Sequence, residues 1–381
     1  MGRTHATPSG MHPTVADVRA ALDEIAPPAL AQSWDNVGLI LGDPAAIVRR
    51  VLLCIDLTPK VVQEAIRGKF DFAVAYHPSI FKPIQRLRAD SAQTDASVFQ
   101  CARAGIAIYS PHTALDAADG GTNDVLAAIA GVRDPRPLEY ADTPGAPRCK
   151  LVAFVPAADV DRVADALFDA GAGRIGEYEK CSYRVSGRGT FFGGPSTKPT
   201  RGVRGRIENV DEVRLETVVP SDRIPHAIAA LRIAHPYEEP AFDLYPLKPE
   251  PTDGIGRVGP LEKPTSLGAL ARRMKRATAA KRVQLVGDPR KRIDRAVIVA
   301  GAAGSLPFRA ALAPSDVVIT GEIRHHDALA IQRSGAAAIA LGHWASERPV
   351  LNPLAEALRA RIRSIRVVVS TADADPFEPL S

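Results

Sequence analysis

The chain has 381 residues, of which 46% are hydrophobic and 24% are charged, so it has enough apolar material for more than one globular core. No stretch approaches the roughly 20 uninterrupted apolar residues of a membrane helix, and residues 1–12 lack the apolar core of a signal peptide. We therefore expect a disordered leader over residues 1–12, a cytoplasmic location and no membrane partner.

The net charge of +5 at pH 7 favours a small anionic ligand such as a phosphate compound, although arginines scattered over a solvated surface give the same total. No run of lysine and arginine is interleaved with aromatic residues, which argues against nucleic acid as a partner. The cysteines have no CxxC spacing, and we expect reduced thiols that fill the core at Cys54, Cys101, Cys149 and Cys181.

The first third of the chain alternates helical and strand-like patterns. Apolar residues within 15–25 recur at steps of three and four, as on one face of a helix. The segments that follow predict strands at 48–57, 70–77 and 106–112, and helices at 59–69 and 95–105. This alternation is typical of a mainly parallel sheet that is covered by helices and gathers ligands at the carboxyl ends of its strands.

The pattern changes at about residue 148. A strand, a helix, two long strand-like segments, a second helix and a short strand at 241–247 give the βαββαβ order of a ferredoxin-like unit. The Pro-rich segment PLKPEPTDG marks a boundary, and the α/β pattern then resumes. We predict one α/β domain, at 13–147 and 251–371, split by an α+β domain at 148–250 and followed by a tail at 372–381.

Histidines and carboxylates gather just beyond the predicted strands. The residues concerned are His77, His112, Asp116, Glu322, His325, His326, Asp327, His343 and Glu347. Imidazoles and carboxylates together suit divalent metal ions such as Zn, Fe, Mn or Co, and two ions sharing a carboxylate would use several of each. Each of these residues, taken alone, could equally be an ordinary packed or solvated side chain. Their coincidence at one edge of the sheet is what indicates a metal site.

Two glycine-rich stretches are weaker signals. GIGRVG, residues 254–259, matches GxGxxG but follows a Pro-rich linker rather than a strand, so the dinucleotide-binding interpretation lacks its structural context. AGAAGS, residues 300–305, follows a predicted strand but has no GK[ST], which leaves a tight turn whose backbone amides face an anion.

Seven motifs, in this order, carry a family resemblance: SWDNVGLILGDP, YHPSIFKPIQRL, YSPHTALDAADGGTND, HPYEEPAFDLYPL, GIGRVGPL, TGEIRHHDAL and GHWASE. Together they resemble the NIF-three-like family, also known as dinuclear metal centre hexameric proteins and as GTP cyclohydrolase I type 2 homologues. The resemblance covers about residues 13 to 371. HPYEEPAFDLYPL is similar to the long form of the family, in which the inserted ferredoxin-like domain resembles the PII and CutA proteins.

The resemblance implies a homo-oligomer, a toroidal hexamer, with a two-metal site that faces an internal cavity. The ligands that it implies are His77, Asp116, His343 and Glu347. The family's usual His-His pair is Tyr76-His77 here, and a phenol is a poor ligand at neutral pH. The sequence therefore allows either one or two metal ions per subunit. His112 or His326 would replace the missing histidine as a metal ligand, or would transfer protons.

The leading hypothesis from the sequence is a metal-dependent hydrolase of a small anionic, nucleotide-like molecule, in which His112 or His326 moves protons. Opening of the GTP ring at C8 fits this chemistry, but a fold and a metal site do not fix a substrate. The alternative is a non-catalytic hexameric metal-binding or regulatory scaffold, whose PII-like insert senses a ligand.

Overall fold

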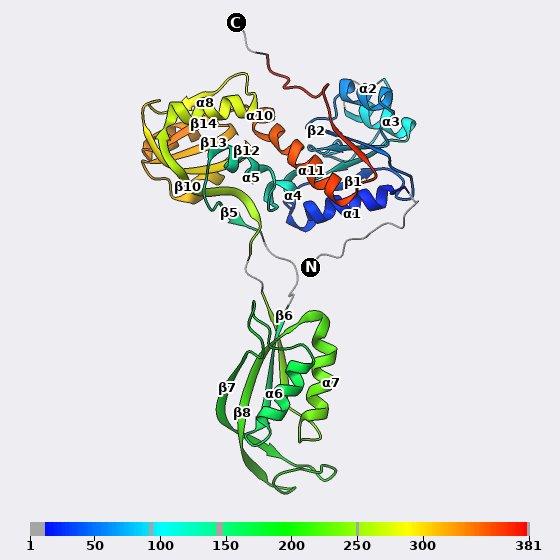
Figure 1. Cartoon of the computed structure of the whole chain (residues 1–381), viewed down its shortest axis with the longest axis vertical. Helices are drawn as coiled ribbons and strands as arrows, with labels where there is room; N and C mark the ends of the chain where they lie inside the picture. The colour runs from blue at the N-terminus through cyan, green and yellow to red at the C-terminus, as the bar shows by residue number, and fades with distance from the viewer. Residues whose placement is uncertain (1–11, 91–93, 142–147, 249–250, 379–381) are drawn as a thin grey trace. The chain divides into compact units, whose positions relative to one another are not determined.

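The computed structural model describes residues 12–90, 94–141, 148–248 and 251–378 (Figure 1). The chain forms two compact units: a core unit, Met1–Asp142 with Pro251–Ser381, and an insert, Thr143–Glu250. The predicted fold class, a split α/β domain with an inserted α+β domain, is confirmed. The predicted leader lies outside the described residues up to residue 11, and residues 372–378 of the predicted tail contain no helix or strand.

The first sheet of the core unit is mainly parallel. Its strands, in spatial order, are β1 (Gly38–Leu41), β4 (Ala107–Ser110), β3 (Phe72–Ala75), β2 (Arg50–Cys54) and β15 (Arg366–Val369), with only β1 antiparallel to its neighbour. Val51 and Leu53 face one core while Leu52 and Cys54 face the other, because side chains alternate along a strand. Helices α1 (Val15–Ile25) and α11 (Leu351–Arg361) cover the first face, and α2 (Pro59–Arg67) and α3 (Thr94–Ala104) cover the second.

The second sheet of the core unit is mixed. Its strands, in spatial order, are β11 (Gln284–Val286), β14 (Ala337–Ala340), β13 (Asp316–Glu322), β12 (Arg292–Ala302), β10 (Gly254–Ser266) and β5 (Arg136–Tyr140). Only β12, β13 and β14 are parallel. Helices α5 (Thr122–Ala130) and α8 (Leu267–Thr278) pack on one face, and α9 (His325–Arg333) packs on the other. GIGRVG lies within β10, so it forms no phosphate-binding loop.

Two short helices lie where the sheets approach each other. Helices α4 (His112–Ala117) and α10 (His343–Glu347) are found, together with α11, between the two sheets (Figure 1). Trp344 of α10 packs against the cores of both sheets. Four short 3₁₀ helices complete the described helices: Pro28–Leu30, Ser221–Arg223, Leu306–Ala310 and Arg348–Val350.

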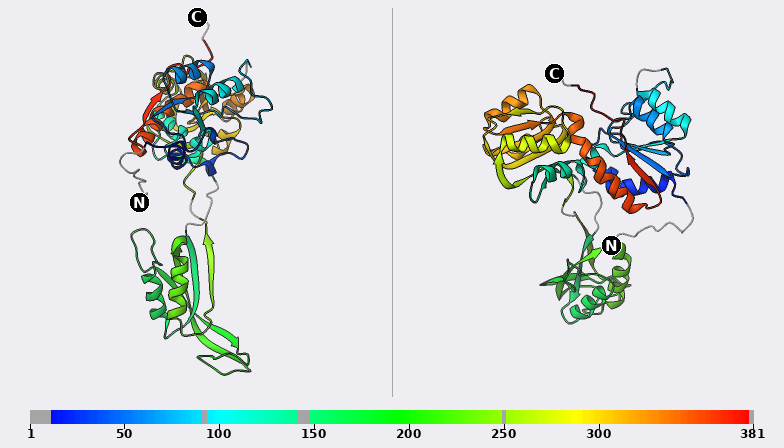
Figure 2. Two further views of the ribbon diagram at one scale, coloured as in Figure 1. Left: turned by 90° about the vertical axis from the view of Figure 1, so that its right-hand side faces the viewer. Right: turned by 45° about the horizontal axis from the view of Figure 1, so that its top comes forward.

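The insert has the predicted ferredoxin-like order. Its elements are β6 (Arg148–Pro156), α6 (Val160–Asp169), β7 (Ser182–Phe192), β8 (Ile207–Pro220), α7 (Ile224–Ala234) and β9 (Phe242–Leu247). The antiparallel sheet has the order β7-β8-β6-β9, and both helices cover one of its faces (Figure 2). Leu151, Leu167, Leu215 and Leu231 form the centre of its core. The narrower likeness to PII and CutA proteins stays a prediction.

The chain leaves and re-enters the core unit between two paired strands. Tyr140 of β5 is paired with Gly254 of β10, and in the insert Arg148 of β6 is paired with Leu247 of β9. Each unit therefore closes its own hydrogen-bond ladder at the point where the insertion begins and ends.

None of the described helices combines the length and the apolar character that crossing a lipid bilayer requires. The four cysteines are free, and three of them, Cys54, Cys101 and Cys149, are buried as expected for core residues.

Arg257 joins β10 to the α4–α5 connection. Its side chain is 3% exposed, and its five N–H groups donate to both carboxylate oxygens of Asp124 and to the carbonyls of Ala118, Gly254 and Gly256. Every donor of the guanidinium is thus satisfied, which is what a buried arginine requires. The ion pair joins β10 to α5, and the hydrogen bond to Ala118 joins β10 to the end of α4, which carries two predicted site residues.

We predict that Arg257→Met destabilises the core unit by about 3 kcal/mol, because it removes the cation paired with Asp124 and the N–H groups that Arg257 donates to three carbonyls. Urea unfolding followed by tryptophan fluorescence measures this, since Trp34 and Trp344 both lie in the core unit. Arg133→Met is the matched control, because Arg133 pairs with Asp134 on the exposed surface. Equal stability of the two variants would contradict the role given to Arg257.

Candidate metal centre

The carboxyl ends of strands from both sheets meet at one site. His77 follows β3, Asp56 follows β2, and α4 follows β4 in the first sheet. Helix α10 follows β14 in the second sheet, with His343 as its first residue and Glu347 as its last. Because carboxyl ends of parallel strands share an edge, side chains that directly follow them are brought together.

Three predicted ligands converge. His77, His343 and Glu347 each offer one ligand atom, and these atoms lie within 4.8 Å of one another. Nε2 of His77 lies 3.2 Å from Oε2 of Glu347, and Nε2 of His343 lies 3.2 Å from Oε1 of the same carboxylate. The Glu347 side chain is 5% exposed, so water contributes little to its solvation.

Each imidazole is oriented by a carboxylate on its far side. Nδ1 of His77 lies 2.9 Å from Asp56, and Nδ1 of His343 lies 3.3 Å from Glu322. A carboxylate can only accept, so each Nδ1 faces a group that accepts from it, and each Nε2 is directed at Glu347. Histidines that bind metal ions are commonly held in this way by a second carboxylate.

Electrostatics favour a positive charge between the rings. Burial lowers the pKa of His77, but Asp56 and Glu347 outweigh burial and raise it to about 10. Glu347 is also the main cause that raises the pKa of His343 to about 9, against burial. Protons thus occupy Nε2 when no metal ion does, and a divalent cation competes with them for the same lone pairs.

The buried carboxylate of Glu347 fits a metal ligand. Although Nε2 of His77 is 3.2 Å away, the geometry is not that of a hydrogen bond, and Oε2 of Glu347 has no hydrogen-bond partner among the described residues. A buried oxygen without a partner is costly unless something else satisfies it. Gly301 makes room for this carboxylate, because a Cβ at that position would collide with Oε1 of Glu347.

Asp116, the fourth predicted ligand, lines the same cavity as His343 and Glu347, and one of its oxygens is bound to Tyr76. Its Oδ1 accepts a short hydrogen bond from the hydroxyl of Tyr76, which in turn accepts one from Thr122 at 3.3 Å. Burial raises the pKa of Asp116 to about 6, although the bond from Tyr76 opposes this. Burial also raises the pKa of Tyr76 well above its usual value, so the phenol stays neutral and acts as a donor.

His112 occupies a strained position beside the cluster. Its backbone φ of 22° is unusual for a residue with a side chain, and its Nδ1 lies 2.8 Å from Asp35. Burial raises the pKa of Asp35, but hydrogen bonds from His112 and Thr113 outweigh it and hold the pKa at about 2. Asp35 is therefore ionised and accepts a hydrogen bond from Nδ1 of His112.

A cavity of about 410 Å³ opens beside these residues. It is lined by Trp34, His112, Asp116, His343 and Glu347, by Arg309 and by residues 299–303. The AGAAGS stretch therefore lies at the wall of the cavity, with Gly301 and Gly304 both at positive φ. Imidazoles, carboxylates, an arginine and an indole ring face one volume that is large enough for a small ligand.

His326 is not brought to this cavity. It lies on the exposed surface of α9 and its ring stacks edge-on against His325, so it does not line the cavity. Glu322 is the member of the TGEIRHHDAL motif that reaches the site. Sequence reasoning missed Asp56 and Asp35. The rule that found His77 missed Asp56 because the predicted strand at 48–57 contained it, whereas the strand of the structure ends at Cys54. Asp35 had no signal beyond its motif.

The comparisons with known proteins identify the family of the chain. The sequence model of Duf34/NIF3 (NGG1p interacting factor 3) matches residues 13–376. The chain belongs to the Duf34/NIF3 family. A protein of Mycobacterium tuberculosis named GTP cyclohydrolase 1 type 2 homolog is 37% identical over 369 residues, which cover 95% of this chain and 96% of the relative. A Listeria innocua protein of the same name is 32% identical, with 94% and 97% covered.

Solved structures support the same membership. A Bacillus cereus protein related to NIF3 has a TM-score of 0.75 at 31% sequence identity, covering 97% of this chain and 99% of its own. A Staphylococcus aureus protein has a TM-score of 0.76 at 27% identity, covering 97% and 100%. The fold of the whole chain, insert included, is therefore one that this family uses.

We predict that Glu347→Gln abolishes stoichiometric binding of a divalent cation, because it removes the charge that both imidazoles face. Asp56→Asn should weaken binding by about 10- to 100-fold, since it removes the group that orients His77. Titration of the metal-free protein with Zn²⁺ or Mn²⁺ by calorimetry measures both effects. His326→Ala is the control and should bind as the wild type does. Unchanged affinity in Glu347→Gln would contradict the assignment.

Proposed function

We propose that the protein is a metal-dependent hydrolase of a small anionic, nucleotide-like substrate. The observation that carries the proposal is the convergence of His77, His343 and Glu347, of which His343 and Glu347 line the 410 Å³ cavity. A divalent cation held by these residues, such as Zn, Fe, Mn or Co, would polarise the attacked centre and lower the pKa of a water molecule. The donor set of two nitrogens and one carboxylate oxygen suits all four metals.

The remaining residues of the cavity support the substrate class. Arg309 brings a positive charge to the wall of a cavity that also contains the carboxylates of Asp116 and Glu347. It is paired with Glu139 at 3.2 Å. Trp34 is 59% exposed and offers a flat apolar surface to a base or another ring. His112, fixed by Asp35, is the residue that we assign to proton transfer. GTP is the first compound to test, because the name of the relatives contains it.

We expect the metal-loaded wild type to hydrolyse at least one compound in a screen of nucleotides and phosphoesters. His343→Ala should lose both metal and turnover. His112→Ala should keep its metal and lose about 100- to 10,000-fold in kcat, because it removes the proton-transfer group and no metal ligand. Chromatography of the products together with metal analysis measures these outcomes. His326→Ala is the matched histidine control and should behave as the wild type does.

A wild type that binds metal and turns over nothing in this screen would favour the second candidate function. This is a non-catalytic metal-binding or regulatory assembly in which the insert senses a ligand. The observation that favours it is a second cavity, of about 310 Å³, that lies wholly within the insert. A wild type without stoichiometric metal after reconstitution would contradict both candidates.

We infer one metal ion per subunit from the position of Tyr76. The resemblance places a histidine there in the wider family, whereas Tyr76 here is fully buried and donates its hydroxyl proton to Asp116. Its raised pKa disfavours the phenolate, which is the form that binds metal. One imidazole is thereby missing and one carboxylate oxygen of Asp116 is already used, so a second cation has too few ligands.

We predict that the wild type binds one Zn²⁺ or Mn²⁺ per chain and that Tyr76→His raises this number to two. Tyr76→Phe, which removes only the hydroxyl, is the control and should still bind one. Mass spectrometry of the native protein counts the ions directly. Two ions in the wild type, or one in Tyr76→His with a preserved fold, would contradict the inference.

We also propose a hexamer, as the resemblance implies. Support comes from large apolar side chains that are exposed on the core unit, since patches of this kind mark interfaces. Phe81, Ile84 and Leu87 are exposed side chains of this kind. Light scattering tests this proposal, and a stable species at the mass of a single chain, 40.5 kDa, would contradict it.

A further inference from the structure

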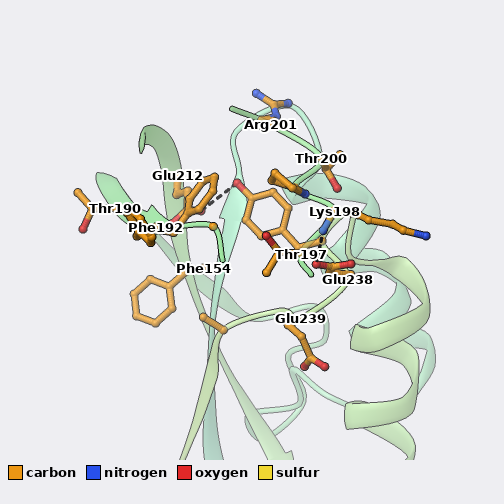
Figure 3. Close-up of a pocket in the computed structure, with 16 residues that line it drawn as sticks. Phe154, Thr190, Phe192, Thr197, Lys198, Thr200, Arg201, Glu212, Glu238 and Glu239 are labelled. Carbon is orange, nitrogen blue, oxygen red and sulfur yellow. Dashed lines mark hydrogen bonds between the residues drawn. The ribbon is translucent and has the colours of Figure 1, made fainter. Parts of the chain in front are cut away.

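The insert contains a cavity of about 310 Å³ at the end of its β7–β8 hairpin (Figure 3). Its walls are the last residues of β7, the loop at 197–201 and the segment at 237–241. The loop is fastened to this segment, because the backbone N–H of Lys198 donates to Glu238 at 2.9 Å and the hydroxyl of Thr200 donates to the carbonyl of Pro236 at 2.8 Å. The cavity is therefore a built feature of the insert and does not depend on the core unit.

One carboxylate lies in the inner part of the cavity. Oε1 of Glu212 accepts a hydrogen bond from the hydroxyl of Tyr237 at 3.1 Å, drawn as a dashed line beside Glu212 in Figure 3. Within the described part of the chain, Oε2 of Glu212 has no hydrogen-bond or ion-pair partner. Gly189 leaves space for it, since a Cβ at that position would collide with Oε2.

The other charged residues of the cavity lie at its exposed rim, and they comprise two cations and two anions. Lys198 and Arg201 are the cations, and Glu238 and Glu239 are the anions. Arg201 lies 3.8 Å from the carboxylate of Asp159, and its guanidinium is directed away from Glu212 in Figure 3. Glu212 is thus the charge that the cavity itself leaves uncompensated.

The rest of the inner wall is aromatic. Phe154, Phe191 and Tyr237 are partly buried there, and Phe192 stands at the edge with 63% of its surface exposed. Aromatic rings favour cations through the negative charge of their faces, and they also bury the apolar body of a ligand. A negative group among rings excludes an anion and favours a compound that carries both an ammonium group and an apolar part.

We propose that this cavity binds a small organic cation, a protonated amine on an aromatic or aliphatic body. The ammonium group donates to Oε2 of Glu212, which is held in place by Tyr237, and the apolar body contacts the phenylalanine rings. A volume of about 310 Å³ accommodates a compound of this size. The proposal concerns residues of the insert alone, so it stands or falls independently of the metal centre.

The test uses the full-length chain and three compounds of nearly equal shape. Phenethylamine is a cation at neutral pH, 2-phenylethanol is neutral and phenylacetate is an anion. Ligand-observed saturation-transfer NMR should detect phenethylamine at millimolar concentration. The alcohol should bind about 10- to 100-fold more weakly and the anion should not bind, because only the ammonium group makes a charge-assisted hydrogen bond.

Two variants locate the binding. Glu212→Gln keeps the shape of the side chain and should weaken phenethylamine by about 10- to 100-fold. Glu216→Gln is the matched control on the same strand, because Glu216 pairs with Lys150 and Arg214 and does not line the cavity. If Glu212→Gln does not fold, as judged by circular dichroism, Gly189→Ala displaces the carboxylate and should have the same effect.

Three outcomes would overturn the proposal. They are no binding of phenethylamine at millimolar concentration, binding of phenylacetate that equals or exceeds it, and unchanged affinity in a folded Glu212→Gln or Gly189→Ala variant.

Discussion

Two imidazole Nε2 atoms that face one buried carboxylate form the interaction on which the core unit depends for its chemistry. Nε2 of His77 and Nε2 of His343 each lie 3.2 Å from Glu347, and acceptors that face one another need a positive charge between them. The two histidines come from different sheets. The arrangement therefore requires that the carboxyl ends of strands from both sheets meet at this site. The short helix α10 then places His343 and Glu347 beside His77.

Small residues and one buried arginine make this approach possible. Gly301 and Gly321 permit α10 to lie directly against β12 and β13, because a side chain at either position would collide with Glu347, Ser346 or the backbone of His343. Arg257 holds the α4–α5 connection from the other side. None of these three residues is a candidate metal ligand, yet they determine how close the histidines and carboxylates of the site lie to one another.

Much of the fold could be predicted from the sequence, because buried parallel strands are continuous apolar runs and Pro-rich segments mark the insertion. The strands at 72–75 and 316–322 and the order of the insert are examples. The strand at 254–266 could not be recognised, since it contains glycines and prolines and no apolar run. The strand at 136–140 is short and partly exposed, so it has no periodic signal either.

The site was predicted in part for the same reasons. Proximity to strand ends identified His77, His343 and Glu347, whereas His326 shared their sequence context but lies on the exposed surface of a helix. The bond between Tyr76 and Asp116 joins residues 40 positions apart, and no spacing rule anticipates such a pair. A carboxylate that orients a histidine of the site, as Asp35 orients His112, can be identified only from the folded structure.

The place of the insertion has a consequence for how such a chain can change. Because Tyr140 and Gly254 are paired across β5 and β10, hydrogen bonds join the two parts of the core at the very point where more than 100 residues interrupt the sequence. The pairing of Arg148 with Leu247 likewise brings the two ends of the insert together. A module with adjacent ends, set into the turn of a hairpin, can be gained, exchanged or lost while the register of every other strand stays the same.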